Sequence, residues 1–304
     1  MVSRVPTVSV VIPLYNARRF VAEAVRSILT QSFGDFELIV IDDGSTDGSD
    51  RFVEQAAAGD PRLRLVRQEN KGVSAAANHG MNLARGEFLA RMDADDVSLP
   101  ARLEKQVAFL RDHPDRVLVG SMAMFIDEDG APLYPMPGLK VSHEQIDAGM
   151  LAVEWTILQP SVMMRTEAVR RVGGYRENLR IHEDHDLFLK LAEIGKVANL
   201  PEVLLYYRQH PVSAVSVYAD EHVKALESVL RDAWKRRGLS GPIPEVPPHP
   251  NDPRRELKRK RLWAWQSLNA GHIATARKYA SAALRAAPFD RESWRILYCA
   301  LRGY

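Results

Sequence analysis

Short apolar runs alternate with amphipathic stretches through the first hundred residues of the chain. The runs 8–12 (VSVVI) and 36–41 (FELIVI) are mostly apolar, which is typical of strands buried on both faces of a sheet. The stretch 17–31 instead places apolar residues three and four positions apart, as an amphipathic helix does. Strands that alternate with helices predict βαβ units, and therefore an α/β fold with a mainly parallel sheet.

The same alternation continues to about residue 237. Further strands are predicted at 63–66, 88–92, 117–125, 159–165 and 203–207. Further helices are predicted at 51–58, 73–85, 101–111, 142–150, 166–172, 183–194 and 219–237. Residues 127–138 are rich in turn-forming residues. We therefore expect residues 1–237 to form one large α/β domain.

The last quarter of the chain has a different pattern. Residues 241–253 contain six prolines, a density that predicts a semi-rigid linker at 238–253. The helical patterns after it resemble a single tetratricopeptide-like unit, and they lie at 254–268, 273–286 and 291–301. One such unit cannot bury its own apolar faces. We expect residues 254–304 to dock on the main domain or on a partner.

Composition and charge narrow the classes of protein. The 304 residues are 46% hydrophobic and 26% charged, as in an ordinary globular protein. The lone cysteine, Cys299, excludes an internal disulfide framework and fits a reducing compartment. Neither a signal segment nor a run of eighteen apolar residues occurs, so we expect a cytoplasmic protein. The net charge is +2, with +5 in residues 254–261 and about −3 in the remainder, which argues against a nucleic-acid partner.

Three carboxylates lie together at Asp93, Asp95 and Asp96, directly after the predicted strand 88–92. Open α/β sheets bind ligands at the carboxyl ends of their strands. Two aspartates one residue apart can turn toward one hard cation such as Mg²⁺ or Mn²⁺. The alternative is a solvated acidic loop or a helix N-cap, and capping is the role we expect for Asp96.

A second acidic turn, 42–45 (DDGS), ends the strand 36–41 and is expected at the same edge of the sheet. A carboxylate there can accept hydrogen bonds from a base or a ribose, although Ser45 and Asp47 could equally cap a helix. The chain contains neither GxGxxG nor a P-loop motif, which argues against a dehydrogenase or a P-loop enzyme. A nucleotide site without such a loop must neutralise its diphosphate in another way. A cation at Asp95 would do so.

The predicted helix 183–194 begins in a cluster of two histidines and three acids at 182–186. The acids could complement the helix dipole, or one of them could act as a general base. The histidine spacing does not match the i, i+4 spacing of a helical zinc site. Farther along, Arg208 could contact a phosphate and His210 could bind a metal, although a histidine after a strand is more often a surface or packed residue.

Taken together, the motifs resemble those of the family-2 glycosyltransferases. They occur in the family's order as PLYN at 13–16, DDGS at 42–45, DADD at 93–96 and HED at 182–184. The resemblance covers about 8–216 and excludes the prolines and the C-terminal helices. It implies an inverting enzyme of GT-A fold, a Rossmann-like, mainly parallel sheet flanked by helices, here with a C-terminal helical extension. It also implies a nucleotide-sugar donor.

The resemblance implies a role for each matched residue on the donor side. Asp43 would contact the uracil or equivalent base, Tyr15 would stack on that base, and Pro13 would lie on the same loop. Asp95 would be the main ligand of a divalent metal, Mn²⁺ or Mg²⁺. Asp93 would lie nearer the donor ribose.

The remaining roles concern the reaction and the diphosphate. Asp184 would be the base that removes a proton from an acceptor hydroxyl, in a single displacement that inverts the sugar. His210 lies where some relatives add a metal ligand or a diphosphate contact. Relatives often carry Arg where this chain has Ala77. The diphosphate would therefore depend more on the metal, on Arg208 or on Lys71.

The acceptor side is less defined, because Arg176 stands where relatives favour an acid. The chain lacks the QxxRW signature of processive synthases, so we expect transfer of one sugar, with UDP-sugar the leading donor. The acceptor would be a glycan or a lipid-linked molecule of surface polysaccharide or lipopolysaccharide biosynthesis. The basic run 254–261, flanked by Trp263 and Trp265, could contact lipid headgroups at the inner face of the membrane, or could be a plain solvated helix end.

Two other functions fit parts of the sequence. One is a non-catalytic GT-A module that holds nucleotide or glycan and uses its C-terminal helices as an adaptor. The other is a nucleotidyltransferase, a class that usually has a Gly-rich N-terminal loop where this chain has 13–16 (PLYN).

Overall fold

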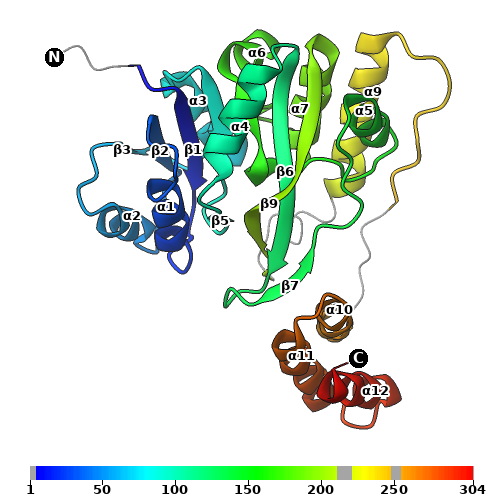
Figure 1. Cartoon of the computed structure of the whole chain (residues 1–304). Coiled ribbons are helices and arrows are strands. Elements are labelled where there is room, and N and C mark those ends of the chain that lie inside the picture. The colour runs from blue at the N-terminus through cyan, green and yellow to red at the C-terminus, as the bar shows by residue number, and fades with distance from the viewer. Residues whose placement is uncertain (1–4, 211–220, 248–254, 304) are drawn as a thin grey trace.

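The structure is a computed structural model that describes residues 5–210, 221–247 and 255–303 (Figure 1). In these residues one sheet has nine strands in the order β3-β2-β1-β4-β8-β6-β9-β5, with β7 beside β6. The strands are β1 (Val8–Leu14), β2 (Phe36–Asp42), β3 (Leu63–Arg67), β4 (Phe88–Arg91), β5 (Val97–Ser98), β6 (Arg116–Ile126), β7 (Pro132–Pro135), β8 (Met163–Arg165) and β9 (Lys196–Arg208). The helices are α1 (Val21–Leu29), α2 (Ser49–Ala57), α3 (Val73–Leu83), α4 (Arg102–Asp112), α5 (His143–Leu151), α6 (Thr166–Val172), α7 (Glu183–Ile194), α9 (His222–Arg237), α10 (Arg255–Asn269), α11 (Ile273–Ala286) and α12 (Arg291–Arg302).

The first four strands along the chain are parallel, as the sequence predicts. β2 and β4 flank β1, and β3 pairs with β2. Every residue of β1 and β2 is buried. Because side chains alternate along a strand, Val10 and Ile12 pack in the hydrophobic cluster that includes α1, whereas Val11 packs in the cluster that includes α3. Helices on both faces bury the sheet, and the residues that follow β1, β2 and β4 meet at one edge.

The second half of the sheet is mixed rather than parallel. β8 pairs antiparallel with both β4 and β6, while the long strands β6 and β9 pair in parallel. β9 begins at Lys196, seven residues before the predicted start at Val203, and the pairing shifts register along the way. The predicted strand 159–165 is divided into a 3₁₀ turn at Gln159–Ser161 and β8, because Pro160 has no N–H for a ladder.

The C-terminal helices form a compact unit of α10, α11 and α12 that docks beside β7 (Figure 1). Trp263 of α10 packs edge-on against Tyr279 of α11, with ring centroids 5.0 Å apart. Lys278 and Tyr279 reach Asp127, which directly follows β6. The helical unit therefore docks on the main domain, one of the two arrangements that we expect for a single unit of this kind.

The predicted linker is partly packed. Residues 238–247 form no helix or strand, yet Val246 is buried against Leu226 and Leu230 of α9. The rest of the predicted linker, 248–253, lies outside the described residues. Across the described parts of the chain, no helix combines the length and the apolar character needed to cross a bilayer.

Candidate active site

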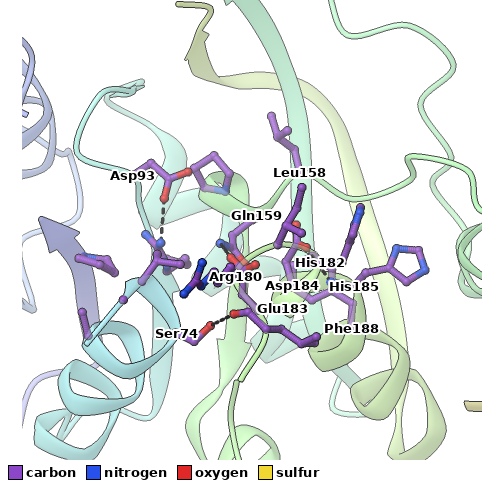
Figure 2. Close-up of a pocket in the computed structure, with 18 of the residues that line it drawn as sticks. Ser74, Asp93, Leu158, Gln159, Arg180, His182, Glu183, Asp184, His185 and Phe188 are labelled. Carbon is purple, nitrogen blue, oxygen red and sulfur yellow. Dashed lines mark hydrogen bonds and ion pairs between the residues drawn. The ribbon is translucent and has the colours of Figure 1, made fainter. Parts of the chain in front are cut away.

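A cleft of about 1350 Å³ opens at the edge of the sheet where β1, β2 and β4 end (Figure 2). The start of α7 forms its opposite wall. Its lining includes every predicted site residue except His210, namely Pro13, Tyr15, Asp43, Lys71, Asp93, Asp95, Asp184 and Arg208. The order of parallel strands thus brings together residues that are up to 195 positions apart in the sequence, between 13 and 208.

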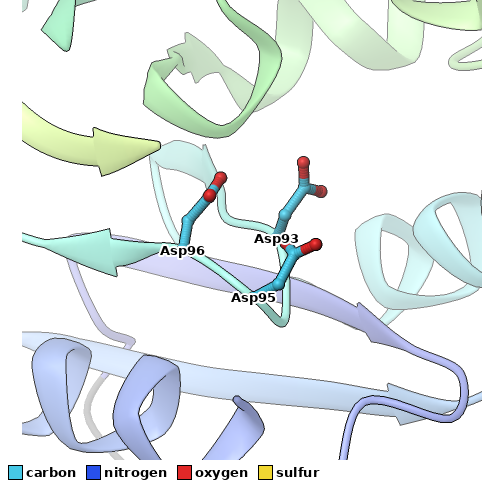
Figure 3. Close-up of side chains that lie close together, drawn as sticks. All are labelled: Asp93, Asp95 and Asp96. Atoms are coloured by element: carbon cyan, nitrogen blue, oxygen red, sulfur yellow. The ribbon is translucent and has the colours of Figure 1, made fainter. Parts of the chain in front are cut away.

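The three aspartates after β4 form one acidic cluster (Figure 3). Asp93, Asp95 and Asp96 offer carboxylate oxygens that lie within 4.8 Å of one another. Asp96 is 1% exposed, and its Oδ1 accepts a hydrogen bond from the Arg208 N–H at 2.8 Å. Its Oδ2 has no partner within 5–210, 221–247 and 255–303, the described residues. Burial, with the neighbouring Asp95 and Asp93 charges, raises its pKa well above the usual range. The predicted capping role is wrong, because α4 begins at Arg102 and Asp96 turns into the cluster.

A buried arginine lies beneath this cluster. Arg91, the last residue of β4, is 1% exposed, and its guanidinium contacts Asp93 Oδ1 at 2.8 Å. Burial penalises that charge, but the carboxylates of Asp93 and Glu183 hold the Arg91 pKa above its ordinary value. Burial raises the pKa of Asp93, and the positive charge of Arg91 partly offsets this increase. The sequence signal was present and missed: an arginine inside an apolar strand, two residues from an acid.

Asp43 organises the loop 68–72, which lines the cleft together with the acidic cluster. Its Oδ1 accepts hydrogen bonds from the Gln68 side chain at 2.8 Å and from the Lys71 backbone at 2.9 Å. Its Oδ2 accepts one from the Gly72 backbone at 2.8 Å. Gly72 has a φ of +90°, which glycine adopts without strain. Tyr15, on the neighbouring turn, is 53% exposed and lines the cleft.

His210 and Asp95 are brought together, as the sequence suggested. His210 Nε2 lies 2.7 Å from Asp95 Oδ2, and its Nδ1 is buried with no partner among the residues that the structure describes. The His210 ring also packs against Phe20, with centroids 5.4 Å apart.

Arg208 contacts main-chain carbonyls of two acidic turns and one carboxylate. Its Nε donates to the Asp95 backbone carbonyl at 2.7 Å, and its Nη1 donates to the carbonyls of Asp127 and Glu128 at 3.2 and 3.3 Å. Its Nη2 donates to Glu23 at 2.6 Å. The guanidinium is therefore engaged in holding two acidic turns in place, a structural role that its sequence position did not reveal.

The start of α7 carries a second group of titratable side chains. Asp184 Oδ1 accepts a hydrogen bond from the His185 N–H at 2.8 Å, and burial raises the Asp184 pKa. Burial and the Asp184 charge raise the pKa of Glu183 to about 7. Burial lowers the pKa of His185, whose Nε2 lies 2.9 Å from the Met150 carbonyl. Figure 2 shows Asp93 on one side of the cleft and Glu183 and Asp184 on the other.

The residue before α7 is unusual in its backbone. His182 has a φ of +63°, in the left-handed region that non-glycine residues rarely adopt. Its Nε2 lies 2.8 Å from Nδ1 of His222, the first residue of α9. Burial, together with His222, lowers the pKa of His182 to about 3. Nothing in the sequence indicated this pair, because its members are 40 residues apart.

Comparison with known proteins decides the family. The family model described as "Glycosyl transferase family 2" matches residues 9–173, which is more than half of the chain. The chain belongs to glycosyl transferase family 2. The motifs at 13–16, 42–45 and 93–96 fall inside the matched residues, and the HED motif follows shortly after them.

Two relatives show the range of the family. A putative glycosyltransferase EpsE of Bacillus subtilis is 39% identical over 209 residues, covering 67% of this chain and 73% of that protein. A chondroitin synthase of Escherichia coli is 26% identical over 277 residues, covering 87% of this chain but only 37% of that protein. This glycosyltransferase is thus similar to proteins of polysaccharide synthesis.

Solved structures confirm the GT-A fold. Staphylococcus aureus TarS, crystallised with UDP-GlcNAc, has a TM-score of 0.60 at 18% identity, covering 98% of this chain and 92% of that chain. The mannosyltransferase PcManGT of Pyrobaculum calidifontis, in complex with GDP-Man and Mn²⁺, has a TM-score of 0.59 at 21% identity, covering 99% of this chain and 82% of that chain. At these identities the similarity establishes the fold alone.

The acidic cluster of this glycosyltransferase fits a hard divalent cation. It offers only oxygen ligands, which Mg²⁺ and Mn²⁺ prefer. One of those oxygens, Asp96 Oδ2, is buried and finds no hydrogen-bond partner in the described part of the chain, an arrangement that costs free energy unless a cation or donor satisfies it. The raised pKa values of Asp93 and Asp96 have the same origin, because both carboxylates are buried and lie close to other carboxylates.

Proposed function

We propose that this family-2 member is an inverting, non-processive glycosyltransferase that moves a sugar from a nucleoside-diphosphate sugar to a hydroxyl of a glycan or lipid-linked acceptor. The observation that carries the proposal is the cleft itself. It places the acidic loop after β4 and the Asp184 carboxylate of α7 on opposite walls of one cavity. A donor held on the first wall would present its anomeric carbon toward the second.

The donor wall suits a nucleotide. Asp43 fixes the loop 68–72 with its two carboxylate oxygens, and Tyr15 leaves its ring free to stack on a base. Lys71 lines the cleft, with its backbone N–H held by Asp43. We assign its ammonium to the diphosphate, in place of the engaged Arg208. The proposed donor is a UDP-sugar, since TarS, which shares the fold, was crystallised with UDP-GlcNAc.

Four residues would hold the divalent cation: Asp95 and His210 as the principal ligands, with Asp93 and Asp96 beside them. When bound, the cation would supply positive charge to the departing diphosphate. Arg91 would then keep Asp93 ionised and oriented from below, because its guanidinium lies 2.8 Å from that carboxylate. Arg208 would hold the main chain of Asp95 in place through its Nε.

Asp184 is the proposed general base. It removes the proton of the acceptor hydroxyl while that oxygen forms a bond to the anomeric carbon and the bond from that carbon to the diphosphate oxygen breaks. The pKa of Asp184 is raised by burial, which makes the carboxylate a stronger base than an exposed aspartate. The lowered pKa values of His185 and His182 keep both rings neutral near pH 7, so neither neutralises this base.

The decisive experiment compares Asp184→Asn with the parent chain and with Asp112→Asn, an exposed position at the end of α4. We expect the variant at Asp184 to lose nucleoside-diphosphate release by at least about a hundredfold while its affinity for the nucleotide changes little. The control should keep full activity. In the parent, kcat should rise with pH through a pKa above the ordinary aspartate value, because only the ionised base accepts a proton.

The same assay separates the rival functions. An adaptor module would bind nucleotide with no turnover by any variant, and a nucleotidyltransferase would release pyrophosphate instead of nucleoside diphosphate. Addition of more than one sugar to a single acceptor would contradict the non-processive proposal. We further propose that residues 1–237 suffice for transfer and that the helices after the 238–253 segment have a separate role.

A further inference from the structure

The helix α12 exposes an apolar face that none of the other described residues covers. Trp294, Tyr298 and Leu301 of α12 are 56%, 55% and 59% exposed, and Phe289, just before the helix, is 99% exposed. The positions 294, 298 and 301 follow helical spacing and form one stripe. The opposite side of α12, formed by Ser293, Ile296 and Ala300, is buried in the helical unit.

Arginines run beside this stripe. Arg291, Arg295 and Arg302 are exposed and lie three or four positions from an aromatic residue of the stripe. The Arg302 guanidinium lies over the Tyr298 ring, 4.7 Å from its centroid. The Trp294 indole N–H is satisfied by the Pro288 carbonyl at 2.8 Å, so its ring can leave water without losing a hydrogen bond. Aromatic rings with flanking arginines are typical of helices that lie in a membrane interface.

Charge distinguishes this unit from the rest of the molecule. Residues 255–303 contain eleven Lys or Arg against three Asp or Glu, a net charge of +8. Because the whole chain carries +2, the other residues sum to −6. Such a concentration of positive charge repels a second copy of the same face, and it attracts an anionic surface.

The tryptophans that the sequence suggested for lipid contact are not available. Trp263 is 6% exposed and packs on Tyr279. Trp265 is half-buried and donates its indole N–H to Glu292 at 2.9 Å. The exposed apolar residues of the unit therefore lie on α12. In the sequence, α12 comes about thirty residues after the predicted tryptophans.

The unit is fixed close to the catalytic cleft. Lys278 Nζ and the Tyr279 hydroxyl contact Asp127 Oδ2 at 2.5 and 2.9 Å. The carbonyl of the same Asp127 accepts a hydrogen bond from Arg208, which also holds the Asp95 carbonyl. The helical unit that carries α12 is thus connected to the acidic loop through Asp127 and Arg208.

We propose that α12 docks this protein on an anionic lipid bilayer, with Phe289, Trp294, Tyr298 and Leu301 entering the headgroup region and Arg291, Arg295 and Arg302 facing the lipid phosphates. Such docking would hold the cleft beside the membrane. The proposal concerns binding alone and does not depend on the sugar-transfer reaction.

Cosedimentation of the full chain with phospholipid vesicles tests it. The chain should bind phosphatidylcholine vesicles that contain phosphatidylglycerol, bind pure phosphatidylcholine far more weakly, and dissociate as salt rises. Trp294→Ser with Tyr298→Ser should weaken binding by at least about tenfold, and so should Arg291→Glu with Arg295→Glu. All four side chains are exposed, so the fold should be retained, which circular dichroism would verify.

Matched controls lie outside the C-terminal helical unit, on α1, on α2 and after α9. Leu239→Ser replaces an exposed apolar residue after α9, and Arg26→Glu with Arg51→Glu reverses two exposed charges on α1 and α2. Both controls should bind vesicles as the parent does. The proposal is overturned if the parent does not bind anionic vesicles, if the controls lose binding as the α12 variants do, or if the α12 variants convert a dimer to a monomer in sedimentation equilibrium. The last result would assign the face to a second copy of the chain.

Discussion

Two acidic turns follow strands at the same edge of the sheet, and their surroundings give them opposite properties. The first, after β4, contains Asp93, Asp95 and Asp96. Its Asp96 Oδ2 is buried with no partner among the described residues, and the pKa values of Asp93 and Asp96 are raised. The second, 127–129 (DED) after β6, is paired throughout. Arg19 contacts Glu128 and Asp129, and Lys278 contacts Asp127 and Asp129.

The pKa of Asp129 shows the difference directly, because Lys278 lowers it below the usual range. Both turns look alike in sequence: three acids within four residues at the end of an apolar run. The turn after β4 has an arginine partner, Arg91 at Asp93, and leaves Asp96 Oδ2 without a hydrogen-bond partner among the described residues, so it keeps oxygen atoms that a cation could bind. In the turn after β6, lysine and arginine pair with all three acids, and Lys278 of α11 docks there.

The largest expected effect is the loss of activity on removal of the cation site. Asp95→Ala should lower kcat by at least about a hundredfold, because the departing diphosphate loses several kcal/mol of charge stabilisation. Without added metal its melting temperature should equal or exceed that of the parent, since one charge leaves a crowded cluster. Calorimetry with and without Mn²⁺ provides the check. Unchanged stabilisation by Mn²⁺ in the variant would place the metal elsewhere.

The corresponding substitution in the paired turn 127–129, Asp127→Ala, should lower the stability of the folded protein. Asp127→Ala removes a fully buried carboxylate that accepts hydrogen bonds from Lys278, Tyr279 and two backbone N–H groups. We expect a loss of ~2–4 kcal/mol in the free energy of unfolding, measured by urea denaturation. Arg19→Ala is the control: its side chain is 54% exposed, and its loss should cost under about 1 kcal/mol. Equal losses of unfolding free energy in Asp127→Ala and Arg19→Ala would contradict the stabilising role that we give to the paired turn.

Replacement of Glu183 should have a pH-dependent effect on the free energy of unfolding. The pKa of Glu183 is about 7 in the folded protein because burial disfavours the charge, against an ordinary value of 4.5. The folded state therefore keeps a proton that the unfolded state releases, and stability falls as pH rises from about 4.5 through 7.

Glu183→Gln removes that dependence while keeping an oxygen for the Gln159 amide. The variant should match the parent near pH 4 and exceed its free energy of unfolding by ~3 kcal/mol near pH 8. Urea denaturation at both pH values measures the difference. The exposed Glu54→Gln on α2 should show no such change between the two pH values. A variant at Glu183 that is less stable than the parent at high pH would mean that the buried carboxylate is compensated.

Much of the fold could be predicted from the sequence, because the signals are local. The helices 166–172, 183–194 and 273–286 begin and end where their apolar spacing and flanking glycines or prolines predicted. The buried strands β1 and β2 were evident from continuous apolar runs. The short strand β7 was missed, because Pro132 and Pro135 at its ends read as turn residues.

The sequence by itself determined which acids stand at strand ends, and so which residues could meet at the cleft. Only the tertiary structure decided how each one is used. Asp96 faces the cluster instead of capping a helix, Arg208 is engaged by main-chain carbonyls, and His182 meets His222 across 40 residues. The physical reason is that the free energy of a charge depends on its burial and on its nearest partners. Those partners come from strands and helices far apart in the chain, whose adjacency no local pattern records.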